Sequence, residues 1–487
     1  MGGFRARRLR RIAHSAQSAS GPPLVKYEPG RRSFLAADLV TNQRKQQQEE
    51  EMVTRKDFEA ELLNIFKGLI RIDTSNPPGN EIRAAEFVKN VLENDGIPAK
   101  VLASTPTRGS AIGRLKGSGA KPPVLLLSHL DVVPVEAERW KVDPFAAETK
   151  DEYVWGRGTL DIKDLTSMEL MAVLLAHRTG LNLKRDVILA ATADEEAGGT
   201  YGVKWLIQNH FDEIKAEYAI NEGGVGLRQN GQKVLFCQCA EKGICWIRIK
   251  IKGEGGHGSL PTANNPVVLT GEIISKIGKH VFPVLKTPVT EKLIAGLEKL
   301  GFLPKGIKAA DVFGSSKSLS TGSPSFDKRV NAWIRNTATP TFVRGGTKVN
   351  VIPMETELSV DCRVMPGFDP GEIFKTVKEL AGSADIQYEI LQNKPGTESK
   401  LDTELWRALE TSLNEVEPGA AFLPYLSPGG TDSGFLREKG IVCYGFDPAF
   451  ATWEEWDTVH GIDERISVES LARGTLILYR VLERFCT

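Results

Sequence analysis

The chain has 487 residues, and its 62 lysines and arginines balance 62 aspartates and glutamates, so the formal net charge is zero. This balance gives no electrostatic basis for binding a nucleic-acid backbone or an anionic membrane surface. Hydrophobic residues make up 41% of the chain and charged residues 25%, a composition typical of a globular protein rather than a disordered one. Unbroken apolar runs, such as those at 124–127 and 171–176, are far shorter than the ~18 residues of a membrane span.

The first 52 residues differ from the rest of the chain. Up to Tyr27 they contain five arginines and no acidic residue, and 42–51 is the polar run NQRKQQQEEE. We predict a poorly ordered extension, because so few apolar residues cannot offset the entropy of ordering the segment. The alternatives are an organelle transit peptide, given the arginine-rich start, and a twin-arginine export signal at 31–35. Six cysteines are too few for a disulfide scaffold in so long a chain, so we expect reduced thiols, mostly in strands, and a cytoplasmic location.

From residue 53 onward, predicted helices and strands alternate, and the strands are of two kinds. The first kind is a short, nearly continuous apolar run, found at 124–127, 187–193, 218–220 and 441–446. Such runs indicate strands that are buried on both faces, as in a parallel sheet covered by helices.

The second kind of strand alternates apolar and polar residues, at 247–252, 357–364 and 386–390. Strict alternation is typical of an antiparallel sheet with one face exposed to solvent. With helices between these strands, the order is that of a ferredoxin-like unit. The sequence therefore predicts an α/β domain, formed by 53–241 and 393–487, with a smaller α+β domain inserted at 242–392.

Three of the seven histidines lie in loops with glycine, proline or acidic neighbours: His129, His257 and His460. His129 directly follows the predicted strand 124–127, and Asp131 comes two residues later. In parallel sheets, sites form beyond the carboxyl ends of the strands. A lone loop histidine is more often a solvated surface group, so the case for a site depends on the residues at the ends of the other buried strands.

Carboxylates come after the next two buried strands in the same way. Glu195 and Glu196 lie in A-D-E-E-A-G-G, and Glu222 lies in N-E-G-G. Asp161 lies in G-R-G-T-L-D-I-K-D, just before a predicted helix. Carboxylates gathered at one sheet edge repel one another unless a cation is present. Nitrogen and oxygen ligands without cysteine favour zinc, with cobalt or manganese as alternatives.

Ten motifs succeed one another between about Asp57 and the C-terminus: IDTSNPPGNE (72–81), LLSHLDVVP (126–134), GRGTLDIKD (156–164), ADEEAGG (193–199), NEGG (221–224), GGHGS (255–259), GGTKVNVIP (345–353), DCRVMPG (361–367), GGTDSG (429–434) and TVHGIDE (458–464). In these motifs the chain resembles the dinuclear-zinc peptidases and deacylases, which include acetylornithine deacetylase, succinyl-diaminopimelate desuccinylase, aminoacylase and glutamate carboxypeptidase. The resemblance implies a zinc-peptidase-like catalytic domain with a mostly parallel sheet. The inserted ferredoxin-like domain would serve as a lid or in dimerisation.

The resemblance also implies two divalent metal ions per chain, most often Zn²⁺, with Co²⁺ or Mn²⁺ as alternatives. Asp161 would bridge the two ions. His129 and Glu222 would complete the coordination of one ion, and Glu196 and His460 would complete the coordination of the other. The peptide bond after Asp161 is expected to be cis.

Further roles are implied for residues that do not bind metal. Asp131 would orient the first histidine ligand through its carboxylate. Glu195 would be the general base that passes a proton from water to the leaving amine, and His257 would stabilise the charge developing on the carbonyl oxygen. A substrate carboxylate would be held by Arg363, Asn350, Gly430 and Thr431. Because Arg363 lies on an alternating strand, the alternative is a merely exposed side chain.

The expected reaction is hydrolysis of an amide bond in a small substrate with a free carboxylate. The substrate is an N-acyl amino acid or, as the alternative, a dipeptide or C-terminal peptide bond. A catalytically silent binding protein on the same fold is a third interpretation, which the intact set of metal and base positions disfavours.

The resemblance implies a homodimer through the inserted domain, with His257 reaching into the partner's site. The alternative is a monomer in which domain closure brings this histidine to its own metal ions. The segment 283–345 departs from compact family members, and we interpret it as an elaboration of the smaller domain that reshapes the acyl pocket.

Overall fold

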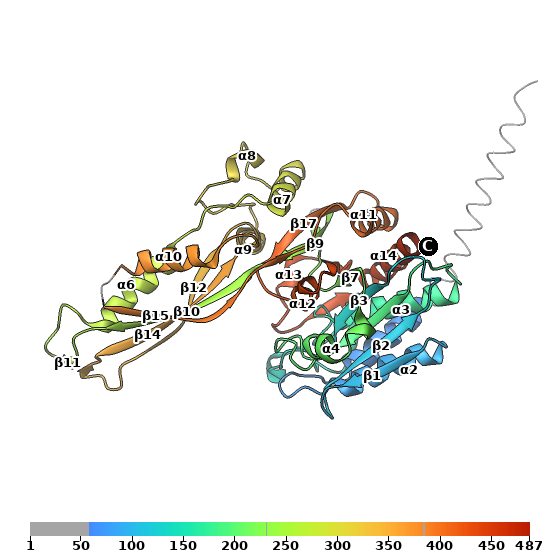
Figure 1. The fold of residues 1–487 in the computed structure, drawn as a ribbon, viewed down its shortest axis with the longest axis horizontal. Coiled ribbons are helices and arrows are strands. Elements are labelled where there is room, and N and C mark those ends of the chain that lie inside the picture. The colour runs from blue at the N-terminus through green and yellow to red at the C-terminus, as the bar shows by residue number, and fades with distance from the viewer. Residues whose placement is uncertain (1–57, 230, 383–384) are drawn as a thin grey trace, which may run out of the picture. The chain divides into compact units, whose positions relative to one another are not determined.

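The computed structural model describes residues 58–229, 231–382 and 385–487. The predicted extension at 1–52 lies outside the described residues. A helical stretch at 58–70 leads into α2 (Glu81–Asn94), and two main β-sheets come after it (Figure 1). None of the helices in this part of the chain is long and apolar enough to cross a membrane.

The larger sheet contains the strands that the sequence predicts to be buried on both faces. Its order is β1-β2-β6-β3-β7-β18-β9-β8-β19, and β16 and β17 also pair with β9. The bounds are β1 (Ala99–Ala103), β2 (Gly109–Leu115), β3 (Val124–His129), β6 (Val187–Thr192), β7 (Tyr218–Asn221), β8 (Val225–Gln229), β9 (Gln232–Glu241), β16 (Thr397–Glu398), β17 (Ala421–Ser427), β18 (Val442–Gly445) and β19 (Phe450–Ala451). The central strands β6, β3, β7 and β18 run parallel, as predicted.

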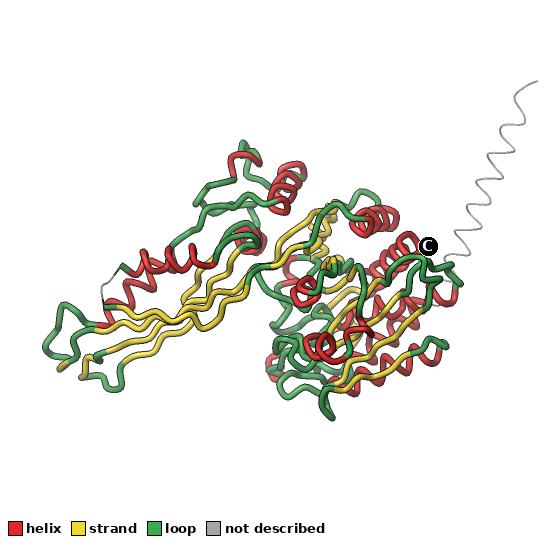
Figure 2. Tube along the Cα trace, in the orientation of Figure 1, coloured by secondary structure: helices red, strands yellow, loops and turns green. Residues whose placement is uncertain are grey.

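Helices cover both faces of the larger sheet, because successive side chains of a strand point to opposite faces. In β3, Val124 and Leu126 join a hydrophobic core with α2, α3 (Lys163–Arg178), α11 (Glu404–Val416) and α14 (Val468–Cys486). Leu125 and Leu127 join a second core with α4 (Val203–Asn209), α5 (Phe211–Ile214) and α12 (Ser433–Glu438). All four side chains are fully buried, which explains the uninterrupted apolar run. Figure 2 shows the helices beside the strands of this sheet.

The smaller sheet has four antiparallel strands, in the order β12 (Thr337–Gly345), β14 (Glu355–Val364), β10 (Gly243–Lys252) and β15 (Ile386–Lys394). Ile247, Ile249 and Ile251 are fully buried and pack against α6 (Pro266–Lys279) and α10 (Pro370–Ala381). This explains the alternating pattern, and the strand order matches the predicted ferredoxin-like unit. Two short strands, β11 (Gly256–His257) and β13 (Val351–Ile352), pair separately.

The chain passes from the larger to the smaller sheet between β9 and β10 and returns between β15 and β16. The register places Thr397 opposite Glu241, so the two crossings lie next to each other. The division into a catalytic domain of 53–241 with 393–487 and an inserted domain of 242–392 stays a prediction.

The segment 283–345 is only partly an elaboration of the smaller domain. It ends in β12 of the smaller sheet, but α7 (Pro288–Lys299), α8 (Ala309–Val312) and α9 (Pro324–Trp333) pack against the larger one. Phe326 of α9 contacts Phe236 of β9, Trp333 and Trp453. The prediction is therefore wrong for these helices, because their apolar faces match side chains of distant strands that no sequence pattern connects with them.

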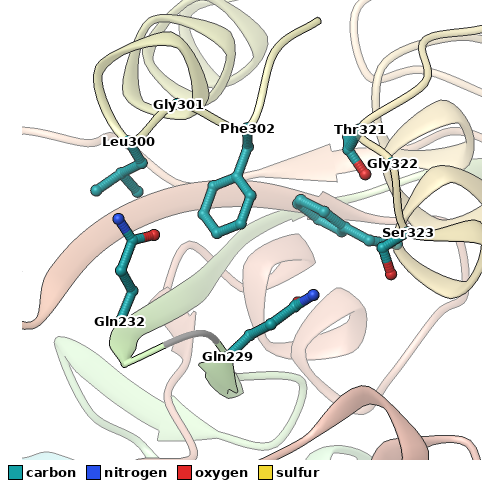
Figure 3. A pocket seen from close by; sticks show the side chains of 9 residues that line it. Gln229, Gln232, Leu300, Gly301, Phe302, Thr321, Gly322 and Ser323 are labelled. Atoms are coloured by element: carbon teal, nitrogen blue, oxygen red, sulfur yellow. The ribbon is translucent and has the colours of Figure 1, made fainter.

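A cavity of about 310 Å³ lies between the ends of α7 and α9 and the β8–β9 hairpin (Figure 3). It is lined by Gln229, Gln232, Leu300, Gly301, Phe302, Thr321, Gly322, Ser323 and Phe326. None of these lining residues is a histidine, a cysteine or a carboxylate, so the cavity offers no imidazole, thiolate or carboxylate that could bind a metal ion.

The remaining elements are short. They are a 3₁₀ turn at Ala137–Arg139, α13 (Trp453–Trp456) and a three-stranded sheet of β20 (Arg465–Ser467), β5 (Tyr153–Trp155) and β4 (Glu148–Lys150). All six cysteines are free and buried, and five of them lie in strands. The predicted placement of the cysteines, mostly in strands, is confirmed, and their reduced state stays a prediction.

Candidate metal site and substrate pocket

The predicted metal site lies at the carboxyl ends of neighbouring parallel strands. His129 is the last residue of β3 and is in register with Thr192, the last residue of β6. Glu195 and Glu196 lie in the loop after β6, and Glu222 directly follows β7. The strand ends therefore converge as the sequence predicts, and the sheet fixes the loops that carry the carboxylates.

Asp161 lies between two histidines. Its Oδ1 is 3.2 Å from His129 Nε2, and its Oδ2 is 2.9 Å from His460 Nε2. His460 Nε2 is also 3.2 Å from Glu196 Oε1, and His129 Nε2 is 3.9 Å from Glu222 Oε2. The peptide bond after Asp161 is cis. One carboxylate between two histidine–glutamate pairs is the arrangement expected around a bridging ligand.

The donor atoms fit divalent metal ions. Ligand atoms of His129, Asp161 and Glu196 lie within 4.8 Å of one another, and so do those of His129, Glu195 and Glu222. Glu222 Oε1 is buried without a hydrogen-bond partner among the described residues. Imidazole nitrogens and carboxylate oxygens without thiolates suit zinc and similar ions. Because Glu195 belongs to the second group, its role as base rather than ligand stays a prediction.

Burial and mutual repulsion perturb the ionisable groups of the cluster. Burial raises the pKa of Glu195 well above its usual range and raises the pKa of Glu222 to about 8. Hydrogen bonds to Asp161 and Glu196 raise the pKa of His460 to about 10. Burial opposes the ionisation of Asp161, but its hydrogen bonds with His129 and His460 outweigh burial and lower its pKa. Cations in this cluster would relieve the repulsion and let its carboxylates ionise.

Asp131 holds the backbone of the loop that carries the two glutamates. Its carboxylate accepts hydrogen bonds from the N–H groups of Glu195 and Glu196, each at 3.1 Å, and from Asn76 Nδ2 at 2.8 Å. His129 Nδ1 lies 2.9 Å from the main-chain oxygen of Asp131 and 3.6 Å from its carboxylate. The predicted orienting contact to His129 therefore runs through the carbonyl group, and the carboxylate positions the glutamate loop.

An open pocket of about 560 Å³ leads to the metal cluster. It is lined by Asp161, Glu195, Glu196, Gly198, Lys204, Glu222, Ile244, Arg363, Gln392, Lys394, Gly429, Gly430, Thr431, Asp432, Phe435 and His460. Residues of both sheets contribute, because β10, β14 and β15 of the smaller sheet begin or end beside the strand ends of the larger one. Of the predicted carboxylate-binding residues, Arg363, Gly430 and Thr431 line the pocket.

Arg363 is already paired with a carboxylate of its own strand. Its Nε and Nη2 donate to Asp361 at 2.7 and 3.1 Å, and its Nη1 donates to the main-chain oxygen of Pro428 at 3.4 Å. Thr431 Oγ1 donates to Glu241 at 2.5 Å. A substrate carboxylate would therefore share these side chains with partners that they already have.

His257 and Asn350 lie elsewhere. His257 is exposed in β11, where its Nδ1 is 2.7 Å from Ser259 Oγ, and the N–H of Gly258 donates to the main-chain oxygen of Asn350. The pocket residue Ile244 is near the start of β10, and Lys252, at the end of that strand, is eight residues or about 26 Å further along. β11 begins beyond this end. Figure 1 shows β11 at the far end of the smaller sheet. These two residues therefore do not join the pocket of their own chain.

Eight pocket residues have no counterpart among the predicted site residues: Gly198, Lys204, Ile244, Gln392, Lys394, Gly429, Asp432 and Phe435. Asp432 lies in the motif GGTDSG, next to the predicted site residues Gly430 and Thr431, so its position in the sequence was a signal for a place in the pocket. Asp432 is nearly fully buried, and burial raises its pKa to about 7. The two lysines and the phenylalanine come from three separate elements and carry no signal in the sequence.

Comparisons with known proteins agree with this geometry. The model of peptidase family M20/M25/M40 matches residues 125–484. The N-fatty-acyl-amino acid synthase/hydrolase PM20D1 of Xenopus tropicalis is 26% identical over 457 residues, covering 89% of this chain and 88% of that protein. Aminoacylase-1 of Dictyostelium discoideum is 27% identical over 402 residues, covering 80% and 90%. The structure of the M20 family metallo-carboxypeptidase Sso-CP2 from Sulfolobus solfataricus matches with a TM-score of 0.64 at 20% identity, covering 87% and 99%, and supports the fold.

An α/β sheet whose strand ends carry imidazoles and carboxylates around one central aspartate defines a metal-dependent amidohydrolase. The family model covers most of the chain and includes the whole cluster, so the chain belongs to peptidase family M20/M25/M40. The fold class and the family predicted from the sequence are confirmed.

Proposed function

We propose that this protein hydrolyses N-acyl amino acids by means of two zinc ions and a glutamate base. The placement of Asp161 between His129 and His460, with Glu195 beside them, is the observation that carries the proposal. Zinc ions, or cobalt or manganese, would be held by His129, Asp161, Glu196, Glu222 and His460. When bound, such ions supply Lewis-acid chemistry that activates water and polarises the carbonyl group.

Glu195 serves as the base in this proposal. Its backbone is fixed through Asp131, which accepts its N–H, and its side chain lies in the pocket beside the predicted ligands. An ionised carboxylate at this position can take up a proton from water and give it to the leaving amine.

The charge of the pocket favours an acylated amine over a free one. Apart from the predicted ligands and base, the charged lining residues are Lys204, Arg363, Lys394 and Asp432. Asp432 is 2% exposed and lies 3.4 Å from Thr192 Oγ1, so it is not available to a substrate ammonium group. A dipeptide would bring a positive charge next to three cations, whereas an N-acyl amino acid brings none. Dipeptide or carboxypeptidase activity is therefore the second candidate.

Arg363 provides the contact for the substrate carboxylate in this proposal, together with Gly430 and Thr431 of the loop that its Nη1 reaches at Pro428. A planar guanidinium can shift between two carboxylates while it keeps two hydrogen bonds. Asn350 lies beside His257 rather than in this pocket, so we assign it to the same distant surface as that histidine.

We propose a homodimer in which His257 completes the site of the partner subunit. Two observations support it: β11 is remote from the pocket of its own chain, and β12 and β15 are edge strands of the smaller sheet. Unpaired strand edges are usually covered in native proteins.

A mixing experiment tests the dimer. His257→Ala and Glu195→Gln are each expected to be nearly inactive. When they are co-expressed, about half of the dimers are mixed and contain one complete site, so activity should return to roughly a quarter of wild type. Mixed dimers that are present but inactive would show that each chain uses its own histidine.

The metal assignment is tested by a matched pair of neighbouring variants. Glu196→Gln should lose metal, because an amide is a poor ligand. Glu195→Gln should keep both metal ions and lose turnover by about 10²–10⁴, the range of general-base catalysis. Elemental analysis and hydrolysis of N-acetyl amino acids measure the two effects, and equal metal loss in both variants would contradict the assigned roles.

We also infer a cytoplasmic location, which the six free, buried cysteines support. Labelling of the full chain in cells, compared with a chain that starts at Met52, tests whether the first 51 residues direct it elsewhere.

A further inference from the structure

Two lysines approach one aromatic ring in the substrate pocket. Lys204 Nζ lies 4.6 Å and Lys394 Nζ 4.0 Å from the centre of the Phe435 ring. The two ammonium groups are therefore less than about 9 Å apart, the sum of these two distances. All three residues line the pocket that contains the metal cluster.

The three residues come from different parts of the fold. Lys204 is in the first turn of α4, which comes after the glutamate loop, and Phe435 is in α12, directly after the motif GGTDSG. Lys394 is the last residue of β15, opposite Ile244 in the smaller sheet. The subsite thus connects both sheets beside the predicted catalytic groups.

The two lysines have a single, loose ion pair among the residues that the structure describes. Lys204 is half-buried and has no ion pair with any residue that the structure describes. Lys394 has a loose contact of 3.7 Å with Glu438, whose side chain is 50% exposed. Exposed pairs of this kind contribute little. Arg363, the third cation of the pocket, is bound to Asp361.

The lysines also change what the ring of Phe435 can do. A pocket phenylalanine normally offers an apolar surface to an acyl chain. Here both ammonium groups lie over the ring, where the electron density of its face attracts them. A long hydrocarbon chain would have to bury two charges, whereas an anionic group beside the ring would be attracted by both.

We propose that Lys204 and Lys394 form a second anion subsite and that the preferred substrate carries a second carboxylate. This inference rests on the proposed amide hydrolysis and deepens it. The first carboxylate is the one assigned to Arg363, and the second belongs either to the side chain of the amino acid or to a dicarboxylic acyl group. The subsite thus favours a dicarboxylic substrate over a fatty-acyl one.

Matched substrates test the proposal with the metal-loaded enzyme. On the amino-acid side, N-acetylglutamate is compared with N-acetylglutamine, which has nearly the same shape without the charge. On the acyl side, N-succinyl-alanine is compared with its terminal amide. One of these pairs should show a preference of at least about tenfold in kcat/KM for the acid, as expected for charge-assisted hydrogen bonds. The pair that responds identifies the position of the second carboxylate.

Lysine variants assign the preference to the subsite. Lys204→Gln and Lys394→Gln should each reduce the preference, and the double variant should abolish it. Lys204→Arg should keep it. Lys439→Gln is the matched control, because Lys439 is exposed at the end of α12 and outside the pocket. Unfolding temperatures of the variants confirm that they are folded.

The outcomes separate the two proposals. Hydrolysis with no preference for the acid in either pair would overturn the subsite and leave the proposed function intact. If no amide is hydrolysed, the proposed function fails, and binding of glutarate to the metal-free protein decides on the subsite. Calorimetry should then show at least about tenfold weaker glutarate binding in the double variant, and equal binding would overturn the inference.

Discussion

Lys242 is a buried cation that folding must accommodate, and its replacement should stabilise the protein. It lies between β9 and β10, where its N–H donates to the main-chain oxygen of Ser427 at 3.0 Å. The side chain is 3% exposed, and its Nζ has no hydrogen-bond partner among the described residues. Burial, with further repulsion from Arg363 and Arg335, lowers the pKa of Lys242 to about 7.

The size of the effect can be worked out from this pKa. The fall of the pKa from an ordinary 10.5 to about 7 means that the buried ammonium group destabilises the folded state. The loss is roughly 5 kcal/mol below pH 7 and about 4 kcal/mol at pH 7. Between these two pKa values the unfolded chain binds the proton and the folded chain does not. The free energy of unfolding therefore rises with pH across this window, and the penalty disappears above pH 10.5.

Lys242→Met tests this reasoning, because methionine keeps the length of the side chain without the charge. Urea unfolding at several pH values between 6 and 10 should show a gain of roughly 2–4 kcal/mol at pH 7 that shrinks toward high pH. Lys439→Met, at an exposed position, should change stability by less than about 0.5 kcal/mol. A Lys242→Met variant with the same stability and pH slope as wild type would refute the reasoning.

Four further predictions concern the site and the fold. Arg363→Ala should lower kcat/KM at least about tenfold more for free-acid substrates than for their amides, and equal losses would make its role structural. Chelation should abolish turnover and lower the unfolding temperature, with recovery on addition of zinc, cobalt or manganese; turnover that survives complete metal removal would contradict the mechanism. Burial opposes ionisation of Asp186, but hydrogen bonds from the N–H of Gly117 and from Lys116 lower its pKa, so stability is lost as pH falls through that value. Asp186→Asn should therefore flatten the acid limb of the stability profile, and an unchanged limb would show that Asp186 contributes nothing. Phe326→Ala should cost about 3–5 kcal/mol, since α9 packs on the larger sheet through this ring; a near-neutral effect would contradict that packing.

The hydrophobic pattern predicted those parts of the fold in which the burial of one or both faces of a strand determines which residues are apolar. Val124 to Leu127 are apolar because alternate residues enter two different cores. Ile247, Ile249 and Ile251 alternate with polar residues because only one face of their strand is covered. The helices α7–α9 obey no such rule, since their partners are distant in sequence and their amphipathic pattern fits either sheet.

The same distinction applies to the site. His129 and Glu222 could be found because each stands at the end of a recognisable buried strand. The pairing of Arg363 with Asp361 depends on rotamers and on the neighbouring Trp246, whose Nε1 also donates to that carboxylate, and sequence patterns do not carry this information. Lys204 illustrates the limit, because on a short helix it is indistinguishable from a solvated lysine until the pocket around it is known.

The order of strands in the larger sheet has a consequence for synthesis of the chain. β18, in the last tenth of the sequence, lies between β7 and β9, which are made much earlier. Until it leaves the ribosome, these two strands cannot be joined through it and each keeps an open edge. The smaller sheet consists of one continuous stretch and is complete before then. The nascent chain should therefore fold its inserted sheet first and depend on chaperones to protect the unfinished edges, which are the most aggregation-prone parts of such an intermediate.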